Sequence, residues 1–172
     1  AGGTLEAVVL THAHMDHVEG VAELVDRLPA PIHLHAADRP LYDAVDQQAA
    51  LFGHRVRTPP PPDRELVGGQ ELAPGECAFR VRHTPGHSPG HVILHSAAAG
   101  VAFVGDVIFA GSIGRTDLPG GDFQALMRSI REEILTLPGD TMLYSGHGPA
   151  TTVERERTTN PFLVPHHPGS RA

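Results

Sequence analysis

Four residues of metal-ligand type lie within six positions near the start of the chain. The segment THAHMDHV, residues 11–18, contains His12, His14, Asp16 and His17. Imidazole nitrogens and carboxylate oxygens are common zinc ligands. Along an extended loop, alternate side chains point the same way, so positions 12, 14 and 16 face one side and His17 faces the other. This spacing suits two adjacent metal ions better than one.

Three further candidates lie far along the chain, each in a similar setting. His87 lies in TPGHSPGH, Asp106 in VAFVGDVIF and His147 in TMLYSGHGP. Each follows a predicted strand and is flanked by Gly or Pro, which favour tight turns. An acid between two apolar stretches, such as Asp106, must be paired, hydrogen-bonded or metal-bound to be tolerated. Loops at the ends of strands can converge at one edge of a sheet, so we predict one composite metal site.

The seven candidates divide by chemistry into two sets of three and one shared carboxylate. The first set contains three imidazoles, a donor set suited to Zn²⁺: His12, His14 and His87. The second set is mixed: Asp16, His17 and His147. The two oxygens of Asp106 can bridge both ions. Two zinc ions about 3.5–4 Å apart share a water molecule and lower its pKa to about 7, which supplies hydroxide at neutral pH. No Ser-His-Asp or Cys-His arrangement is apparent, and we expect Asp16 and Asp106 to be the catalytic carboxylates.

Short strands and helices are expected to position these loops. Residues 6–10 are apolar and β-branched, which predicts a buried strand before the first ligands. Residues 18–28 predict a helix after them, with five residues on its apolar face: Val18, Val21, Leu24, Val25 and Leu28. Helices are also predicted over residues 37–51 and over residues 122–134, where Asp122 is the expected N-cap and Phe123 belongs to the inner face.

Other histidines and the single cysteine receive simpler interpretations. His33 and His35 alternate with apolar residues in a predicted strand and are expected to face solvent. His91 and His95 can support the metal site, but strand-surface positions are favoured. The remaining histidines are expected to have no role in the site: His54, His83, His166 and His167. Cys77 is expected to be a small buried apolar residue. Arg115 and Asp117 are expected either to pair and brace the site or to form a solvated pair.

The composition indicates one domain over residues 1–172 and excludes several classes of function. The net charge is −7, and no basic cluster is present to bind nucleic-acid phosphates. No apolar run approaches the length of a membrane span, and no signal-peptide pattern opens the chain. One cysteine excludes an intrachain disulfide and favours a reducing, cytoplasmic setting. The first residue is Ala, which indicates a processed, trimmed or partial chain.

The candidate ligands resemble the motifs of the metallo-β-lactamase superfamily. The matching elements, in the family's order, are HxHxDH at residues 12–17, TPGH at His87, GD at Asp106 and SGHGP at His147. The resemblance implies an α/β (α+β) fold, the αββα sandwich, with a dinuclear site at the edges of its sheets. His14 stands where flavodiiron relatives carry Glu, which favours two Zn²⁺ ions per chain, with Fe or Mn as alternatives.

Within that superfamily, GSIGRTDLPGGD, SGHGP and ERxRTTNPFL resemble the small glyoxalase-II-like hydrolases. This resemblance implies cleavage of a small-molecule thioester such as S-lactoylglutathione through a metal-bridging hydroxide. Only 25 residues follow His147, so we expect no C-terminal helical domain that holds glutathione. Family members have further strands before the HxHxDH segment, and the corresponding strands, about 30 residues, are expected to be missing from this sequence. A partner that covers the exposed sheet edge is therefore an alternative, and the sequence leaves the oligomeric state open.

Two alternatives come from other functional classes. The GRTD element is shared with persulfide dioxygenases, which use a single iron and oxidise sulfur. The short front end also allows an inactive metal-binding fragment of the same fold. A lactone or a β-lactam is a further candidate substrate for the same site chemistry.

Overall fold

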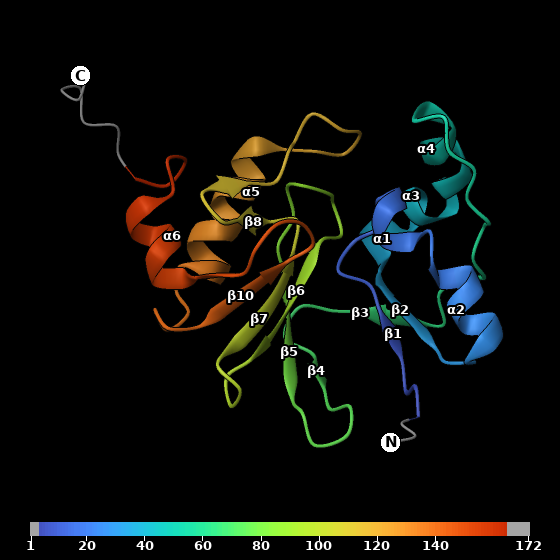
Figure 1. Cartoon of the computed structure of the whole chain (residues 1–172), viewed down its shortest axis with the longest axis horizontal. Helices are drawn as coiled ribbons and strands as arrows, with labels where there is room; N and C mark the ends of the chain where they lie inside the picture. The colour runs from blue at the N-terminus through green and yellow to red at the C-terminus, as the bar shows by residue number, and fades with distance from the viewer. Residues whose placement is uncertain (1–3, 165–172) are drawn as a thin grey trace.

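The computed structural model describes residues 4–164 and shows two β-sheets between two layers of helices (Figure 1). The first sheet is parallel and has the order β1-β2-β3, with bounds Val8–Val9, Ile32–His35 and Arg64–Leu66. Apolar residues of both sheets pack together, including Leu66 of β3 with Val81 and Val92 of the second sheet. The predicted αββα sandwich is confirmed.

The second sheet has six strands in the order β11-β10-β7-β6-β5-β4. Their bounds in chain order are Glu71–Leu72 for β4, Phe79–His83 for β5, Val92–Ser96 for β6, Val101–Gly105 for β7, Met142–Ser145 for β10 and Thr151–Thr152 for β11. The pair β7–β10 is parallel and the other pairs are antiparallel. A separate hairpin pairs β8 (Ile108–Phe109) with β9 (Ser112–Ile113). Several ligand loops therefore begin where a strand of one sheet or the other ends.

Five short helices cover the first sheet (Figure 1). They are α1 (Met15–Val18), α2 (Val21–Arg27), the 3₁₀ helix η1 (Ala36–Asp38), α3 (Arg39–Asp43) and α4 (Val45–Leu51). The prediction of one continuous helix over residues 18–28 and another over residues 37–51 is therefore wrong, because each segment is divided into shorter helices. The predicted apolar face is also only partly buried: Leu24 and Leu28 are 37% and 53% exposed. Val18 and Val21 fill the apolar cluster under this layer and Val25 packs against it, so the covered face is narrower than predicted.

Helices α5 (Phe123–Ser129) and α6 (Val153–Thr159) cover the second sheet, with a π-helical turn, η2 (Ile130–Ile134), after α5. The N-cap prediction is confirmed, because Asp122 Oδ1 accepts a hydrogen bond of 2.9 Å from the Ala125 amide. Leu126 and Ile130 enter the core, as expected. Phe123 is 47% exposed, which corrects its predicted inner position; the first residue of the helix lies beyond the edge of that core.

Residues outside the ligand loops give mixed outcomes. Cys77 is exposed, in a turn between β4 and β5, so the prediction of a buried cysteine is wrong. His33 and His35 are half-exposed on β2, as expected. His54 is exposed, whereas His83 is half-buried and stacks on the His35 ring at 4.2 Å. His166 and His167 lie outside the described residues. No helix within residues 4–164 combines the length and the apolar character that crossing a bilayer requires.

Candidate metal centre

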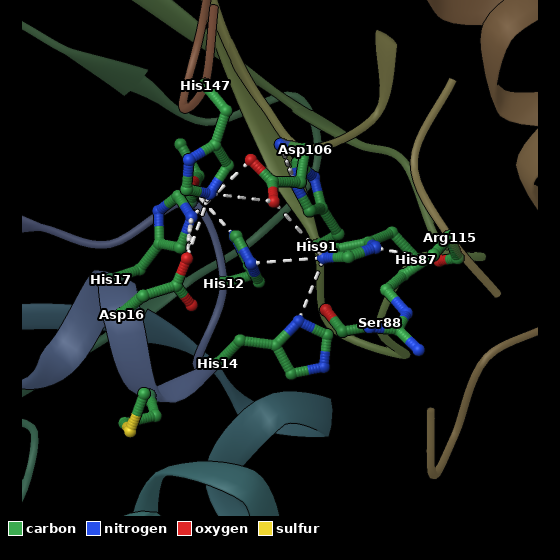
Figure 2. Close-up of polar contacts among 12 residues, drawn as sticks. His12, His14, Asp16, His17, His87, Ser88, His91, Asp106, Arg115 and His147 are labelled. Atoms are coloured by element: carbon green, nitrogen blue, oxygen red, sulfur yellow. Dashed lines mark hydrogen bonds and ion pairs between the residues drawn. The ribbon is translucent and has the colours of Figure 1, made fainter. Parts of the chain in front are cut away.

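The seven predicted ligands come together at one end of the sandwich (Figure 2). They form two groups, and the potential ligand atoms within each group lie within 4.8 Å of one another. The first group contains His12, His14 and His87. The second group contains Asp16, His17, Asp106 and His147. The structure thus brings together the residues that the sequence placed in one site: the first set is as predicted, and Asp106 joins the second.

The first group is buried and its ring nitrogens point at one another. His14 Nδ1 lies 2.8 Å from His87 Nε2, which lies 3.3 Å from His12 Nε2. The three residues are at most 7% exposed. Each neutral imidazole has one N–H donor and one acceptor, so one His87 nitrogen cannot satisfy two ring nitrogens equally well. A cation at the common point accounts for this convergence.

The pKa values of the first group favour metal binding. Burial lowers the pKa of His12 well below its usual value. Burial, with the adjacent His87, lowers the pKa of His14 to about 4, and burial also lowers the pKa of His87. All three imidazoles are therefore neutral at neutral pH, which is the form that binds a metal ion.

The second group combines carboxylates with imidazoles. His147 Nε2 lies 2.9 Å from Asp16 Oδ2, and His17 Nε2 lies 3.4 Å from Asp106 Oδ1. Burial lowers the pKa of His17, but the carboxylates of Asp106 and Asp16 outweigh it and raise the pKa. Burial raises the pKa of the Asp106 carboxyl, but His17 and the nearby imidazoles outweigh it and lower the pKa. The Asp106 carboxylate is therefore ionised at neutral pH, which is the form that binds a metal ion.

Asp106 lies between the two groups. Its Oδ2 atom is 3.7 Å from His87 Nε2 in the first group and 3.5 Å from His147 Nε2 in the second. Its Oδ1 atom lies 3.4 Å from His17 Nε2, so Oδ2 approaches both groups and Oδ1 approaches the second, a position suited to a carboxylate shared by two metal ions (Figure 2).

Two observations show that the residues fit metal ions. His17 Nε2 and Asp106 Oδ1 are buried atoms without a hydrogen-bond partner, which is rare and costly in native proteins. A Cβ atom at Gly146 would lie 2.4 Å from Asp106 Oδ1 and 2.5 Å from His17 Cε1, so only glycine leaves both side chains in place. With imidazole and carboxylate donors, the centre fits two divalent ions such as Zn²⁺.

Neighbouring groups orient the ligands. The Nδ1–H of His87 donates to the Arg115 carbonyl at 2.8 Å, which directs Nε2 toward the centre. Arg115 and Asp117 form an exposed ion pair at 2.7 Å, so this segment braces the site through its backbone and not through the paired side chains.

The sequence interpretation of His91 as a strand-surface residue is wrong. His91 is fully buried, accepts a hydrogen bond of 3.1 Å from the Asp106 amide and stacks on the His12 ring at 4.8 Å. Burial lowers its pKa well below the usual value, so the ring is neutral and can accept that bond. His95 is also buried, at 8% exposure, on the core-facing side of β6.

A buried carboxylate that sequence reasoning missed connects the two loops of the first group. Asp38 is fully buried at the end of η1. Its Oδ2 atom accepts hydrogen bonds from the Ala13 amide at 2.9 Å and the Ser88 hydroxyl at 2.8 Å, and Oδ1 accepts from the Gly90 amide at 2.5 Å. Ala13 separates His12 from His14, and the other two partners follow His87. Asp38 therefore holds the ligand loops at their mutual distance.

Replacing Asp38 with asparagine is expected to weaken metal binding by the first group by about 10–100-fold, the usual effect of losing a residue that orients ligands. The new NH₂ group would face an N–H donor, which leaves buried donors unpaired and costs about 1–3 kcal/mol of unfolding free energy. Competition with a chromogenic chelator measures the affinity. Asp63→Asn is the matched control, because Asp63 accepts from the Ile32 amide, outside the ligand loops. Equal metal affinity in both variants would contradict this role.

A pocket of about 530 Å³ opens above the centre. Side chains of both candidate metal groups form its floor. Its walls include five apolar side chains, Met15, Phe52, Phe109, Ile113 and Leu118. Arg115 is its one arginine, and the carboxylate of Asp117 neutralises it. The pocket therefore combines a polar reactive floor with apolar walls.

Comparisons with known proteins agree with this geometry. The family model of the Metallo-beta-lactamase superfamily matches residues 1–147. The hydroxyacylglutathione hydrolase GloC of Haemophilus influenzae is 38% identical over 161 residues, which cover 92% of this chain and 76% of that protein. Among solved structures, TTHA1623 in a di-iron-bound form is 47% identical, with a TM-score of 0.86 and coverage of 91% and 77% of the two chains. The B3 metallo-β-lactamase BLEG-1 is 43% identical, with a TM-score of 0.87 and coverage of 93% and 78%.

Proposed function

The chain belongs to the metallo-β-lactamase superfamily, and from this membership we propose that it is a dinuclear zinc hydrolase that cleaves small-molecule thioesters such as S-lactoylglutathione. The observation that carries the proposal is the position of Asp106, whose Oδ2 atom approaches histidine nitrogens of both groups of candidate metal ligands. The first group would hold one metal ion and the second group the other, with Asp106 shared. When bound, the two ions would supply a hydroxide nucleophile at neutral pH and polarise the carbonyl group.

The side chains of the chain contribute positioning, exclusion of water and proton transfer. Met15 and Phe52 on one wall and Phe109 on another would hold the thioester over the floor and shield its carbonyl from bulk water. Asp16 is partly exposed at the pocket floor, and its Oδ2 atom is fixed by His147 Nε2 at 2.9 Å. We assign Asp16 Oδ2 to accept the proton of the attacking water and Asp106 to hold the reacting centre between the two groups.

The choice of a thioester rests on the relatives and on the nature of the pocket. GloC is named for hydrolysis of a glutathione thioester. The pocket lining contains no cysteine, and the one cysteine of the chain lies exposed in a turn between β4 and β5. The proposal needs no cysteine nucleophile, because the hydroxide would attack the carbonyl carbon directly.

A substrate screen on the metal-loaded chain tests the proposal. Aliquots loaded with zinc, iron or manganese are assayed for thiol release from S-lactoylglutathione, and for oxygen uptake with glutathione persulfide. We expect thiol release with zinc and no oxygen uptake with any metal. Oxygen uptake with iron and no thioester cleavage would replace the hydrolase with a persulfide dioxygenase. A folded chain that cleaves no substrate with any metal would indicate an inactive metal-binding form.

A β-lactam is the second candidate substrate, because the chain is similar over most of its length to the B3 metallo-β-lactamase BLEG-1. The same centre that polarises a thioester carbonyl can polarise a lactam carbonyl. A chromogenic cephalosporin added to the same screen distinguishes the two: a higher kcat/KM for the cephalosporin than for every thioester would favour the β-lactamase.

A further inference from the structure

The β8–β9 hairpin supplies one wall of the pocket. Phe109, Ser112 and Ile113 from its two strands line the cavity, and the Phe109 ring lies 6.3 Å from the ring of His147. The two strands pair only with each other, two residues on each side. A two-stranded hairpin of this size is marginally stable alone, so contacts with the rest of the protein must fix its position.

Ile108 anchors the first strand in the apolar core, and two side chains near the end of helix α6 hold the turn and the second strand. Glu156 Oε2 accepts a hydrogen bond of 2.9 Å from the Gly111 amide, in the turn of the hairpin. Asn160, directly after the helix, donates from Nδ2 to the Ser112 carbonyl at 2.9 Å. The same amide group donates to Glu156 Oε2 at 2.8 Å, so the two side chains act as one unit. One unit therefore holds the turn and the second strand of the hairpin.

Both side chains are fully buried. Glu156 Oε1 accepts a further bond of 2.6 Å from the Thr151 hydroxyl, and within residues 4–164 no arginine or histidine forms an ion pair with this carboxylate. A buried carboxylate without a cationic partner is costly and is tolerated because it accepts several hydrogen bonds. An apolar residue would fill the same space without that cost but would release the hairpin. A fifth hydrogen bond runs from the Phe162 amide to Asn160 Oδ1, and none of the five involves a metal-ligand residue.

We propose that Glu156 and Asn160 are positioning residues that fix the β8–β9 wall and thereby determine which acyl groups the pocket accepts. Because the wall presents Phe109 and Ile113 to the cavity, with Phe109 beside His147, it favours acyl groups that carry an apolar part larger than the small lactoyl group. The selectivity part of this inference rests on the proposed thioesterase activity, whereas the positioning part does not.

Three variants and one control test the positioning. Glu156→Ala and Asn160→Ala each remove bonds to the hairpin. Glu156→Gln retains them, since its carbonyl can accept from Gly111 and Asn160 while its NH₂ group donates to the Thr151 hydroxyl. Thr158→Ala is the matched control, because the Thr158 side chain bonds only within α6. Hydrogen exchange of a peptide covering residues 108–114 is expected to accelerate in the two hairpin-releasing variants and to remain unchanged in Glu156→Gln and Thr158→Ala, with metal content unchanged in all four.

Selectivity is measured with two thioesters of N-acetylcysteamine, the phenylacetyl and the acetyl compound. In Glu156→Ala and Asn160→Ala, KM for the phenylacetyl thioester is expected to rise about tenfold, the effect of losing one apolar wall contact. In the same two variants, KM for the acetyl thioester and kcat for both thioesters are expected to stay within about twofold of the parent values. In Glu156→Gln and Thr158→Ala, both KM and kcat are expected to stay within that range for both thioesters. Equal changes in KM for both thioesters would overturn the assignment of selectivity.

The outcomes separate this inference from the proposed function. If the metal-loaded parent chain cleaves no thioester, the proposed function fails, and calorimetric binding of the thioether S-phenethyl-N-acetylcysteamine replaces KM. A tenfold loss of affinity for this thioether in Asn160→Ala then still supports the inference. Unchanged hairpin exchange in both Glu156→Ala and Asn160→Ala would overturn it whatever the activity. If Glu156→Ala does not fold, the hairpin exchange and the substrate or thioether affinity of Asn160→Ala test the inference without it.

Discussion

Replacing Asp106 with alanine is expected to remove both metal ions and to lower hydrolysis by at least about a thousandfold, the loss of about 4 kcal/mol of transition-state stabilisation. Asp106 is the one carboxylate among the seven ligand residues that approaches nitrogens of both groups, with Oδ1 3.4 Å from His17 Nε2 and Oδ2 3.7 Å from His87 Nε2. Without this carboxylate, the second group keeps a single acid, Asp16, and the positive charges of two ions lose their shared counter-charge.

The measurement is metal content by elemental analysis after dialysis, together with kcat/KM. Asp117→Ala is the control, because Asp117 is an exposed acid paired with Arg115 and touches no ligand. The control is expected to keep both ions. Full occupancy of both sites in Asp106→Ala, with a native circular dichroism spectrum, would contradict the bridging role.

Replacing His87 with alanine is expected to weaken the first ion mainly, and replacing His147 with alanine the second. His87 Nε2 lies near the nitrogens of His12 and His14, whereas His147 Nε2 lies 2.9 Å from Asp16 Oδ2. Each variant is expected to retain about one ion per chain and to lose at least about a hundredfold in kcat/KM, because one of the two ions that stabilise the reacting oxygens is gone.

Titration with a chelator distinguishes the two variants from Asp106→Ala by the number of ions that remain. His54→Ala, at an exposed histidine, is the control and is expected to behave as the parent chain. Loss of both ions from either His87→Ala or His147→Ala would contradict the assignment of one metal ion to each group, because it would show that the two groups bind their ions together.

The ligand residues are predictable from sequence because their chemistry is local. HxHxDH places four donors in six positions, and the glycines and prolines beside His87 and His147 mark the turns that expose them. The αββα fold follows from the same motifs through family resemblance. Periodicity predicts continuous helices over residues 18–28 and 37–51, but it does not show where a helix is interrupted or where the core beneath it ends.

The residues that support the site are not predictable in this way. Asp38 and Glu156 are single acids among ordinary surface-type residues, and their partners lie in other loops, so no spacing pattern reveals them. The sequence favours a strand-surface position for His91, yet a Cβ atom at Gly105 would lie 2.7 Å from the His91 Nε2 atom. That close approach between distant segments exists only in the folded chain.

The most direct test of the central claim is the metal stoichiometry of the purified, folded chain. Elemental analysis after dialysis against metal-free buffer, with protein concentration from amino-acid analysis, gives ions per chain. The arrangement of two donor groups around Asp106 predicts two divalent ions per chain, with zinc supporting thioester hydrolysis. One ion per chain, or a folded chain that binds none when zinc is supplied, would contradict a dinuclear centre.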